Sequence, residues 1–271
     1  VEAGTKPNVH AFKDSLIVHY SMDEDSQLKD LSGNGRNGGF HNPVYVKDRF
    51  GREGKALIAS PGTTNNSMGR GIMSSLPLPR SIDDGMTISM WFQDKSYHSE
   101  KFLFSIEPKQ IGNGPDGYKR LSVFIGSNHP SNGGLFGYFY GISKHTGQVK
   151  TSPPEPIFLW EEDSWYHLCL RSGKSVMING VEVSIGFSPA SNHGLAVDNN
   201  FLNIAGSRYN NQPTPFGGDL DDFRIYDRIL SDEEVAMLYN IEAPPINLTD
   251  TDSDGLSDSD ETNIHKTNPN L

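Results

Sequence analysis

The residues best suited to chemistry in this 271-residue sequence are acidic side chains near its C-terminal end. Counted from Asp250, carboxylates occupy positions 1, 3, 5, 9 and 12, and a glycine occupies position 6. This is the ligand order of an EF-hand-type loop, in which hard oxygen atoms surround Ca²⁺. The expected ligands are Asp250, Asp252, Asp254, the carbonyl oxygen of Leu256, Asp258 and Glu261. The pattern predicts a calcium site, and the alternative is an acidic linker without a bound ion.

Charge and hydropathy restrict the possible partners of the chain. The formal net charge is −11, and the stretch 250–261 holds six acidic and no basic side chains. Lysines and arginines are scattered elsewhere, so we expect no nucleic-acid partner. No apolar run is long enough to cross a bilayer, so we expect no membrane span. The chain starts at Val1 without a methionine, which suggests a mature or excised part of a larger polypeptide whose other domains are partners.

Short segments of alternating apolar and polar residues recur along the chain and are typical of β-strands. In 86–92 the even-numbered positions are apolar and share one face, while Trp91 belongs to the other. Asn179 and Gly180, between two strands, are typical of a two-residue hairpin. The segments expected to form strands are 16–22, 86–92, 102–106, 121–126, 136–141, 165–170, 175–179, 181–185, 201–205 and 219–226. This pattern, with 28 Gly and 17 Pro, predicts an all-β, two-sheet antiparallel sandwich.

One short helix is expected near the end of the sandwich. Ser231 suits an N-cap, acidic residues follow it, and Val235, Leu238 and Tyr239 form an i, i+3, i+4 apolar stripe. The one cysteine, Cys169, excludes an internal disulfide and lies in an apolar strand segment. We therefore expect it in the core as a small apolar residue.

Five segments, in this order, resemble the laminin-G-like jelly roll of the concanavalin A-like superfamily. They are LIVHYSMD at 16–23, DLSGNG at 30–35, MTISMW at 86–91, WYH at 165–167 with INGV at 178–181, and GDLDDFRIY at 218–226 leading to LSDEE at 230–234. The resemblance implies one jelly-roll domain at 13–241, with a linker and calcium-loop tail at 242–271.

The tail also resembles a known type of calcium repeat. The loop at 250–261 is followed by Thr267, Asn268 and Pro269, as in thrombospondin type 3 repeats. Those repeats lie between domains of large secreted bacterial proteins. The resemblance therefore implies a bacterial source and a secreted, extracellular or cell-surface location.

The jelly-roll resemblance implies a second calcium site inside the sandwich. Its matching ligands are Asp23 and Asp222, with carbonyl oxygens from the turn at 34–38. A cation would relieve the repulsion between neighbouring carboxylates. The alternatives are that Asp222 pairs with Arg224 or caps the turn at 33–35. Asp221 is expected to be a solvent-facing neighbour.

Bacterial domains with this resemblance are often accessory modules, which implies a non-catalytic carbohydrate-binding (lectin-like) function. Such sites combine aromatic rings with polar groups in long loops. The expected ligand-binding residues are Arg208, Tyr209, Asn210, Tyr140 and His145, and the expected partner is a polysaccharide or other glycan.

Two other functions stay open. One is an adhesion or structural spacer domain that binds protein or no ligand. The other is a polysaccharide-active hydrolase or lyase, which would need paired carboxylates or a His and Tyr pair. The sequence contains no Glu-x-Asp-x-x-Glu, Gly-x-Ser-x-Gly, phosphate loop or His-Glu-x-x-His. We therefore expect no catalysis.

Overall fold

The computed structural model describes residues 12–40, 43–58, 72–74, 85–95, 101–108, 121–125, 134–135, 158–159, 164–172, 174–183, 200–205 and 216–243. These ranges are mostly β-structure. The elements are η1 (Lys13–Ser15), β1 (Leu16–Tyr20), β2 (Gly38–Gly39), β3 (Val44–Val46), β4 (Ala56–Ile58), β5 (Ile72–Ser74), β6 (Thr87–Asp94), β7 (Lys101–Pro108), β8 (Leu121–Ile125), β9 (Gly134–Leu135), β10 (Phe158–Leu159), β11 (Trp165–Arg171), β12 (Ser175–Ile178), β13 (Val181–Val183), β14 (Asn200–Ile204), β15 (Gly218–Tyr226) and α1 (Asp232–Glu242).

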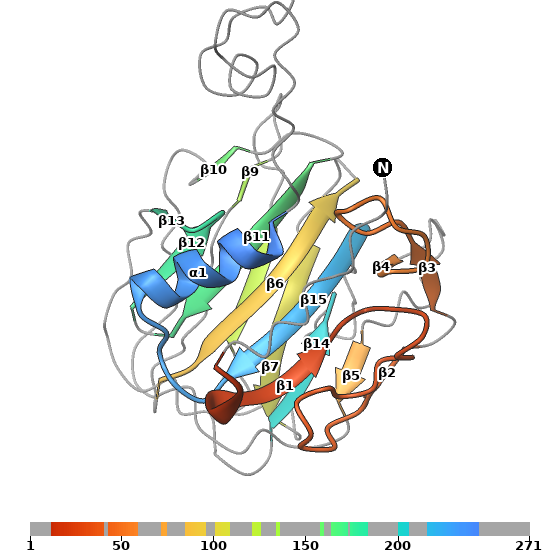
Figure 1. Cartoon of the computed structure of the whole chain (residues 1–271), viewed down its shortest axis with the longest axis horizontal. Helices are drawn as coiled ribbons and strands as arrows, with labels where there is room; N and C mark the ends of the chain where they lie inside the picture. Colours follow the sequence, from red (N-terminus) through yellow and green to blue (C-terminus); the bar gives the residue numbers. More distant parts are fainter. Residues whose placement is uncertain are drawn as a thin grey trace, which may run out of the picture.

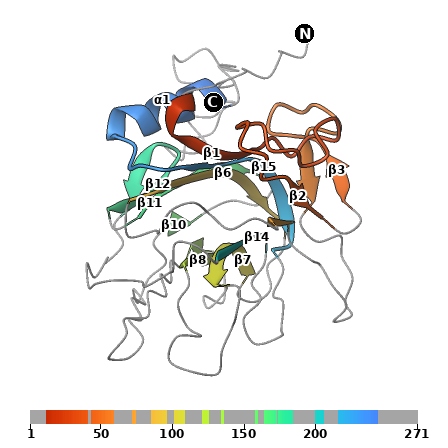
Figure 2. The same ribbon diagram turned by 90° about the horizontal axis from the view of Figure 1, so that it is seen from below.

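Two antiparallel sheets stack face to face and form the sandwich (Figures 1 and 2). The larger sheet has eight strands in the order β13-β12-β11-β6-β15-β4-β3, with β1 also paired to β15. The smaller sheet has five strands in the order β2-β5-β14-β7-β8. A separate strand pair joins β9 to β10. Figure 2 shows α1 on the outer face of the larger sheet, away from the smaller sheet.

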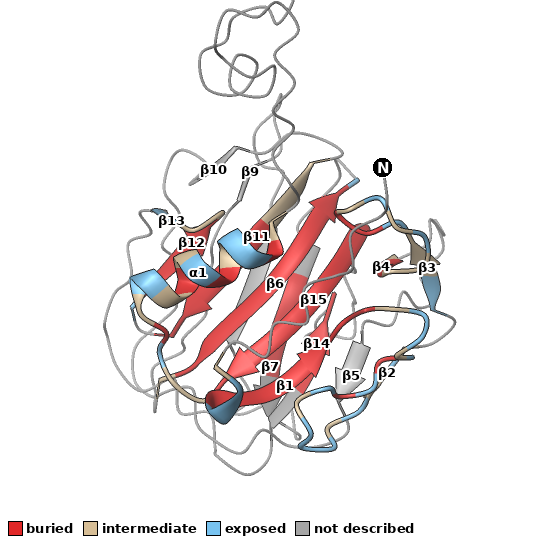
Figure 3. Cartoon of the chain, viewed as in Figure 1, coloured by how far each residue is buried: buried red, intermediate tan, exposed pale blue. Residues whose placement is uncertain are grey.

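The main core lies between the two sheets. The even-numbered apolar residues of β6 point into it, as the alternating pattern predicts. Leu168 and Leu170 of β11, and Leu220 and Phe223 of β15, join them from the larger sheet. Both faces of the central strands β6 and β15 are buried, since the outer face of the sheet carries α1 and the loops around it (Figure 3). Removal of this apolar surface from water is the main driving force for the fold.

β15 changes its partner strand halfway along its length. It pairs with β6 throughout, but with β4 near its start and with β1 near its end. Asp221 lies opposite Trp91, and Arg224 lies opposite Ser89, so three steps along β15 match two along β6. This is a β-bulge, and Asp222 within it has a φ of 47°. The bulge brings both aspartates next to the outer face of the sheet.

α1 begins with the predicted cap. The Ser231 hydroxyl accepts the N–H of Glu234, and the Glu234 carboxylate accepts the N–H of Ser231, which completes a capping box. Val235 and Leu238 pack in a second apolar cluster, whose other members are Leu16, Cys169, Met177, Tyr226 and Leu230. The burial of Cys169 in this cluster confirms its expected role as an apolar residue.

The predicted hairpin at Asn179 and Gly180 is confirmed. Ile178 pairs with Val181, and the two turn residues have φ of 50° and 77°. These positive values are typical of a type I′ turn. The strand expected at 136–141 lies outside the described residues.

Candidate functional site

Buried charged side chains lie between the outer face of the larger sheet and the C-terminal end of α1. We call Arg49, Asp221, Asp222, Arg224 and Glu242 the Arg49 cluster. Each of these side chains is at most 2% exposed. Arg49 pairs with Asp221, donates to Asp222 Oδ2 over 2.8 Å, and donates from Nε to the main-chain oxygen of Glu242 over 2.7 Å. Buried charges need such partners because they have lost their hydration.

A turn organised by Asp48 positions Arg49. Asp48 Oδ1 accepts the main-chain N–H groups of Phe50 and Arg52 over 2.8 and 2.9 Å, and its Oδ2 accepts Arg52 Nε over 2.8 Å. The Arg49 guanidinium also lies 4.6 Å from the ring centre of Phe50 and 4.8 Å from that of Trp91. Cation–π contacts of this kind add to the ion pairs in fixing the guanidinium.

Arg224 and Glu242 form the other half of the cluster. The carboxylate of Glu242 pairs with Arg224 and accepts Trp91 Nε1–H over 3.1 Å. Arg224 also donates to Asp222 Oδ1 over 3.1 Å. Burial raises the pKa of Glu242, and the positive charges of Arg224 and Arg49 oppose that rise. The two arginines thus connect β15, the 48–52 turn and the end of α1.

Three aromatic rings pack together beside the cluster, and one of them contacts a buried serine. The ring centre of His167 lies 5.1 Å from that of Trp91 and 6.0 Å from that of Tyr239. His167 Nε2 lies 2.8 Å from Ser89 Oγ. Burial lowers the pKa of His167 to about 3, and nearby guanidinium charges act in the same direction. Since Ser89 and His167 are both fully buried, this contact is part of the packing and not a nucleophile–base pair open to substrate.

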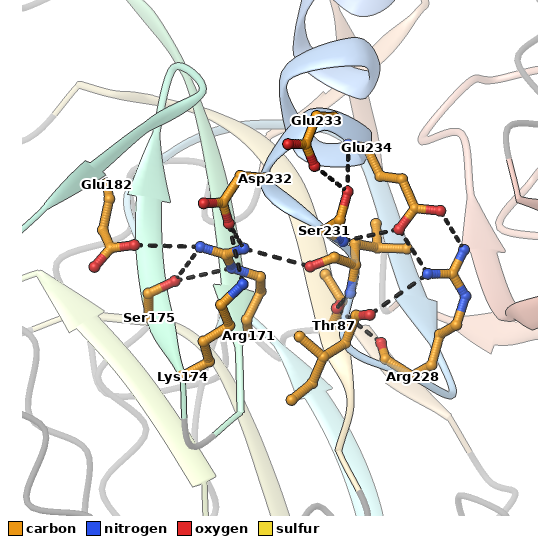
Figure 4. A network of polar contacts seen from close by, with 12 residues as sticks. Thr87, Arg171, Lys174, Ser175, Glu182, Arg228, Ser231, Asp232, Glu233 and Glu234 are labelled. Carbon is orange, nitrogen blue, oxygen red and sulfur yellow. Dashed lines mark hydrogen bonds and ion pairs between the residues drawn. The ribbon is translucent and has the colours of Figure 1, made fainter.

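A second ionic network ties the N-terminal end of α1 to the sheet (Figure 4). The fully buried Arg171 pairs with Asp232 and donates to Ser175 Oγ over 2.8 Å. Hydrogen bonds from Arg171 and Lys174 lower the pKa of Asp232. Together with the Arg49 cluster, this network anchors α1 at both of its ends.

The loop after β1 is organised by the buried carboxylate of Asp30. Its two oxygens accept the main-chain N–H groups of His19, Ser32 and Arg36 over 3.1, 3.0 and 2.9 Å. The main-chain oxygen of Arg36 accepts the Tyr20 hydroxyl over 2.5 Å. Arg36 lies in the turn at 34–38, whose carbonyl oxygens were expected to bind a calcium ion. Its carbonyl oxygen therefore already accepts a hydrogen bond from the protein itself.

In the structure Asp222 forms an ion pair with arginine, which is the alternative to a calcium site that the sequence left open. Asp222 pairs with Arg224 and also with Arg49. Asp23 lies in the turn after β1, where its main-chain oxygen accepts two N–H groups. Within the described ranges, no three or more His, Cys, Asp and Glu side chains are grouped so as to hold a metal ion. Asp221 is fully buried, so the expectation that it faces solvent is wrong; the bulge turns it toward Arg49.

The other predicted site residues lie outside the part of the chain that the structure describes. These are the ligand-binding candidates Arg208, Tyr209, Asn210, Tyr140 and His145, and the tail ligands Asp250, Asp252, Asp254, Leu256, Asp258 and Glu261.

Sequence reasoning missed Arg49 and Glu242. A signal for Glu242 was present, since it extends the apolar stripe of Val235, Leu238 and Tyr239 by one more turn and so falls on the buried face. Arg49 gave no such signal, because its partners are distant in the sequence.

The comparison with protein families defines the class of the chain. A sequence profile of the concanavalin A-like lectin/glucanases superfamily (Laminin_G_3) matches residues 71–236. The chain belongs to this superfamily. It is also 25% identical, over 236 residues, to paraclostridial mosquitocidal protein 1 of Paraclostridium bifermentans. That match covers 84% of the chain and 18% of the relative, so the chain spans less than a fifth of that protein.

Solved structures with the same fold include one separate domain and one part of an enzyme. Domain 4 of AbnA, a GH43 extracellular arabinanase from Geobacillus stearothermophilus, in complex with arabinotriose, has a TM-score of 0.55 and 20% identity, over 83% of this chain and 98% of that domain. Trypanosoma rangeli sialidase has a TM-score of 0.56 and 16% identity, over 83% of this chain and 33% of the enzyme. At these identities the likeness establishes the fold alone.

No helix in the described ranges is both long and apolar enough to cross a membrane.

Proposed function

We propose that this chain is a non-catalytic, carbohydrate-binding module of a larger extracellular protein. The observation that carries the proposal is the match of 83% of this chain to an arabinanase domain whose structure is in complex with arabinotriose. Because 98% of that domain aligns with this chain, the fold of the separate sugar-bound domain is present here almost in full. The chain covers only 18% of the mosquitocidal relative, which supports a module within a longer polypeptide.

The buried acids that the structure describes support a role other than catalysis. Asp221 and Asp222, which are adjacent and on one strand, face Arg49 beneath α1. A glycosidase needs two carboxyl groups on opposite sides of a bound sugar. A carboxylate paired with a buried arginine has no room for a sugar, so these two acids serve the fold.

Glycan binding is tested on the full chain with an array of neutral and acidic glycans, in calcium and in chelator. Binding of a defined glycan class is the expected result. Substitution of Tyr209 and Arg208 by alanine should abolish that binding without changing the thermal midpoint. No binding to any glycan in calcium would instead favour the adhesion or spacer function, and release of reducing ends from a bound polysaccharide would favour the enzyme.

We further propose that the tail at 250–261 binds Ca²⁺ and serves as a spacer between domains. The support is the order of carboxylates and glycine in the sequence. Calorimetry on an Asp250→Ala, Asp252→Ala variant should lose one calcium site relative to the parent chain. Asp260→Ala is the matched control, since position 260 is not in the ligand order. An unchanged stoichiometry in the double variant would contradict the assignment.

A further inference from the structure

The C-terminal end of α1 has no stabilising cation of its own. The helix has 11 residues, three acids in its first turn and no basic residue in its last turn. The last carbonyl oxygens of a helix lack intrahelical donors and carry a partial negative charge. Arg49 Nε donates to the main-chain oxygen of Glu242 over 2.7 Å, from 193 positions earlier in the sequence. The cap of α1 therefore comes from another part of the fold.

The last residue of α1 is also acidic, which is unfavourable at this end of a helix. One carboxylate oxygen of Glu242 forms an ion pair with Arg224, and the other accepts the Nε1–H of Trp91. These contacts exist only while α1 lies against the sheet. The end of the helix is therefore stable as a helix only when it is docked.

The apolar contacts of α1 are separate from the main core. Val235 and Leu238 belong to the smaller cluster on the outer face, whereas the core between the sheets contains no residue of α1. An isolated helix of about 11 residues is marginal in water. Undocking of α1 would thus unfold the helix but leave the contacts between the two sheets in place.

We propose that α1 is a latch, which opens as one unit while the sandwich stays folded, and that the contacts of Glu242 with Arg49, Arg224 and Trp91 hold it closed. The chain leaves the helix at Ala243, whose N–H donates to the main-chain oxygen of Tyr239 over 2.7 Å. The closed latch fixes the point on the sheet from which the following segment begins. Opening frees the helix and lengthens the connection to that segment.

Hydrogen exchange of the full chain, read at single amides, tests the latch. In the parent protein the amides of 235–242 should exchange faster than those of β6 and β15. Glu242→Gln should accelerate the α1 amides by at least about tenfold, which corresponds to about 1.4 kcal/mol, because the contacts of Glu242 are lost when α1 opens. In this variant the amide N–H₂ of the glutamine faces an N–H group of either Arg224 or Trp91. Two donors then face each other, so one of the two contacts is lost. Asn240→Ala, at an exposed position of the same turn, is the matched control.

A second variant separates the latch from general destabilisation. Ile88→Val removes a methyl group of β6 from the core between the sheets, which stays in place when α1 opens. It should accelerate the β6 amides and leave the α1 amides at the rate of the parent protein. The proposal is overturned if α1 and β6 exchange at the same rate in the parent protein. It is also overturned if Ile88→Val accelerates α1 as much as β6, or if Glu242→Gln does not change α1.

Discussion

Arg49 and Asp222 are 173 positions apart in the sequence and are joined by a 2.8 Å hydrogen bond between buried, oppositely charged groups. The contact links the turn at 48–52 to the bulge of β15, the point at which β15 changes its partner from β4 to β1. A strand that changes partner leaves a local gap in the ladder of main-chain hydrogen bonds. At this place the guanidinium of Arg49 contacts the carboxylates of Asp221 and Asp222.

Replacement of Arg49 should strongly destabilise the protein. Arg49→Met removes the positive charge but leaves Asp221 and Asp222 buried. Removal of one partner from a buried ion pair costs about 3–5 kcal/mol, because a charge is left without compensation. Urea unfolding, followed by tryptophan fluorescence, would measure this loss in the free energy of unfolding.

The matched control is another cation from the same turn region. Lys47 and Glu53 form a 3.3 Å pair, but their side chains are 64% and 78% exposed. Lys47→Met should therefore change the free energy of unfolding by only about 0–1 kcal/mol. Equal losses in the two variants would show that the buried cluster has no special role in stability.

The sequence predicted the parts of the fold that depend on neighbours in the chain. The alternation in 86–92 gives the core-facing side of β6, Ser231 gives the start of α1, and Asn179 with Gly180 gives a hairpin. The bulge at Asp222 could not be predicted, because an extra residue is recognised only when both paired strands are known. Arg49 was missed for the same reason, since its partners come from three distant segments.

The Ser231 cap should contribute measurably to stability. Ser231→Ala removes the oxygen that accepts the Glu234 N–H, so this N–H loses its partner at the start of α1. The expected loss is about 1 kcal/mol in the free energy of unfolding. Ser231→Thr keeps the oxygen and should lose much less. If the two variants are equally destabilised, the cap contributes little and the loss has a steric origin.

Gly218 should tolerate no side chain. A Cβ at this position would lie 2.0 Å from the main-chain oxygen of Gln93 and 2.8 Å from the ring of Phe216. Gly218→Ala must therefore push β15 and β6 apart at one end, with a loss of at least about 1–3 kcal/mol. Gly39→Ala is the control, because nothing lies within 4 Å of its Cβ and its φ is not positive. That variant should stay within about 0.5 kcal/mol of the parent protein, and a similar loss in both would contradict the steric argument.

The buried His167 should make the fold less stable in acid. Burial lowers the pKa of His167 from 6.5 to about 3. Between these values the unfolded chain binds a proton at this residue and the folded protein does not, so stability rises with pH. The contribution is complete above pH 6.5 and decreases, as the pH falls toward 3, by about 1.4 kcal/mol per unit.

His167→Gln isolates this contribution, because glutamine can also hydrogen-bond to Ser89 but does not titrate. The free energy of unfolding of both proteins would be measured by urea unfolding at several pH values between 4 and 8. Other acids titrate in both proteins, so the informative quantity is the difference between the two curves. This difference should be constant above pH 6.5 and should change below it, with the parent protein losing stability faster. Parallel curves would mean that His167 takes up a proton in the folded state as readily as in the unfolded chain, and hence that α1 does not keep water from its ring.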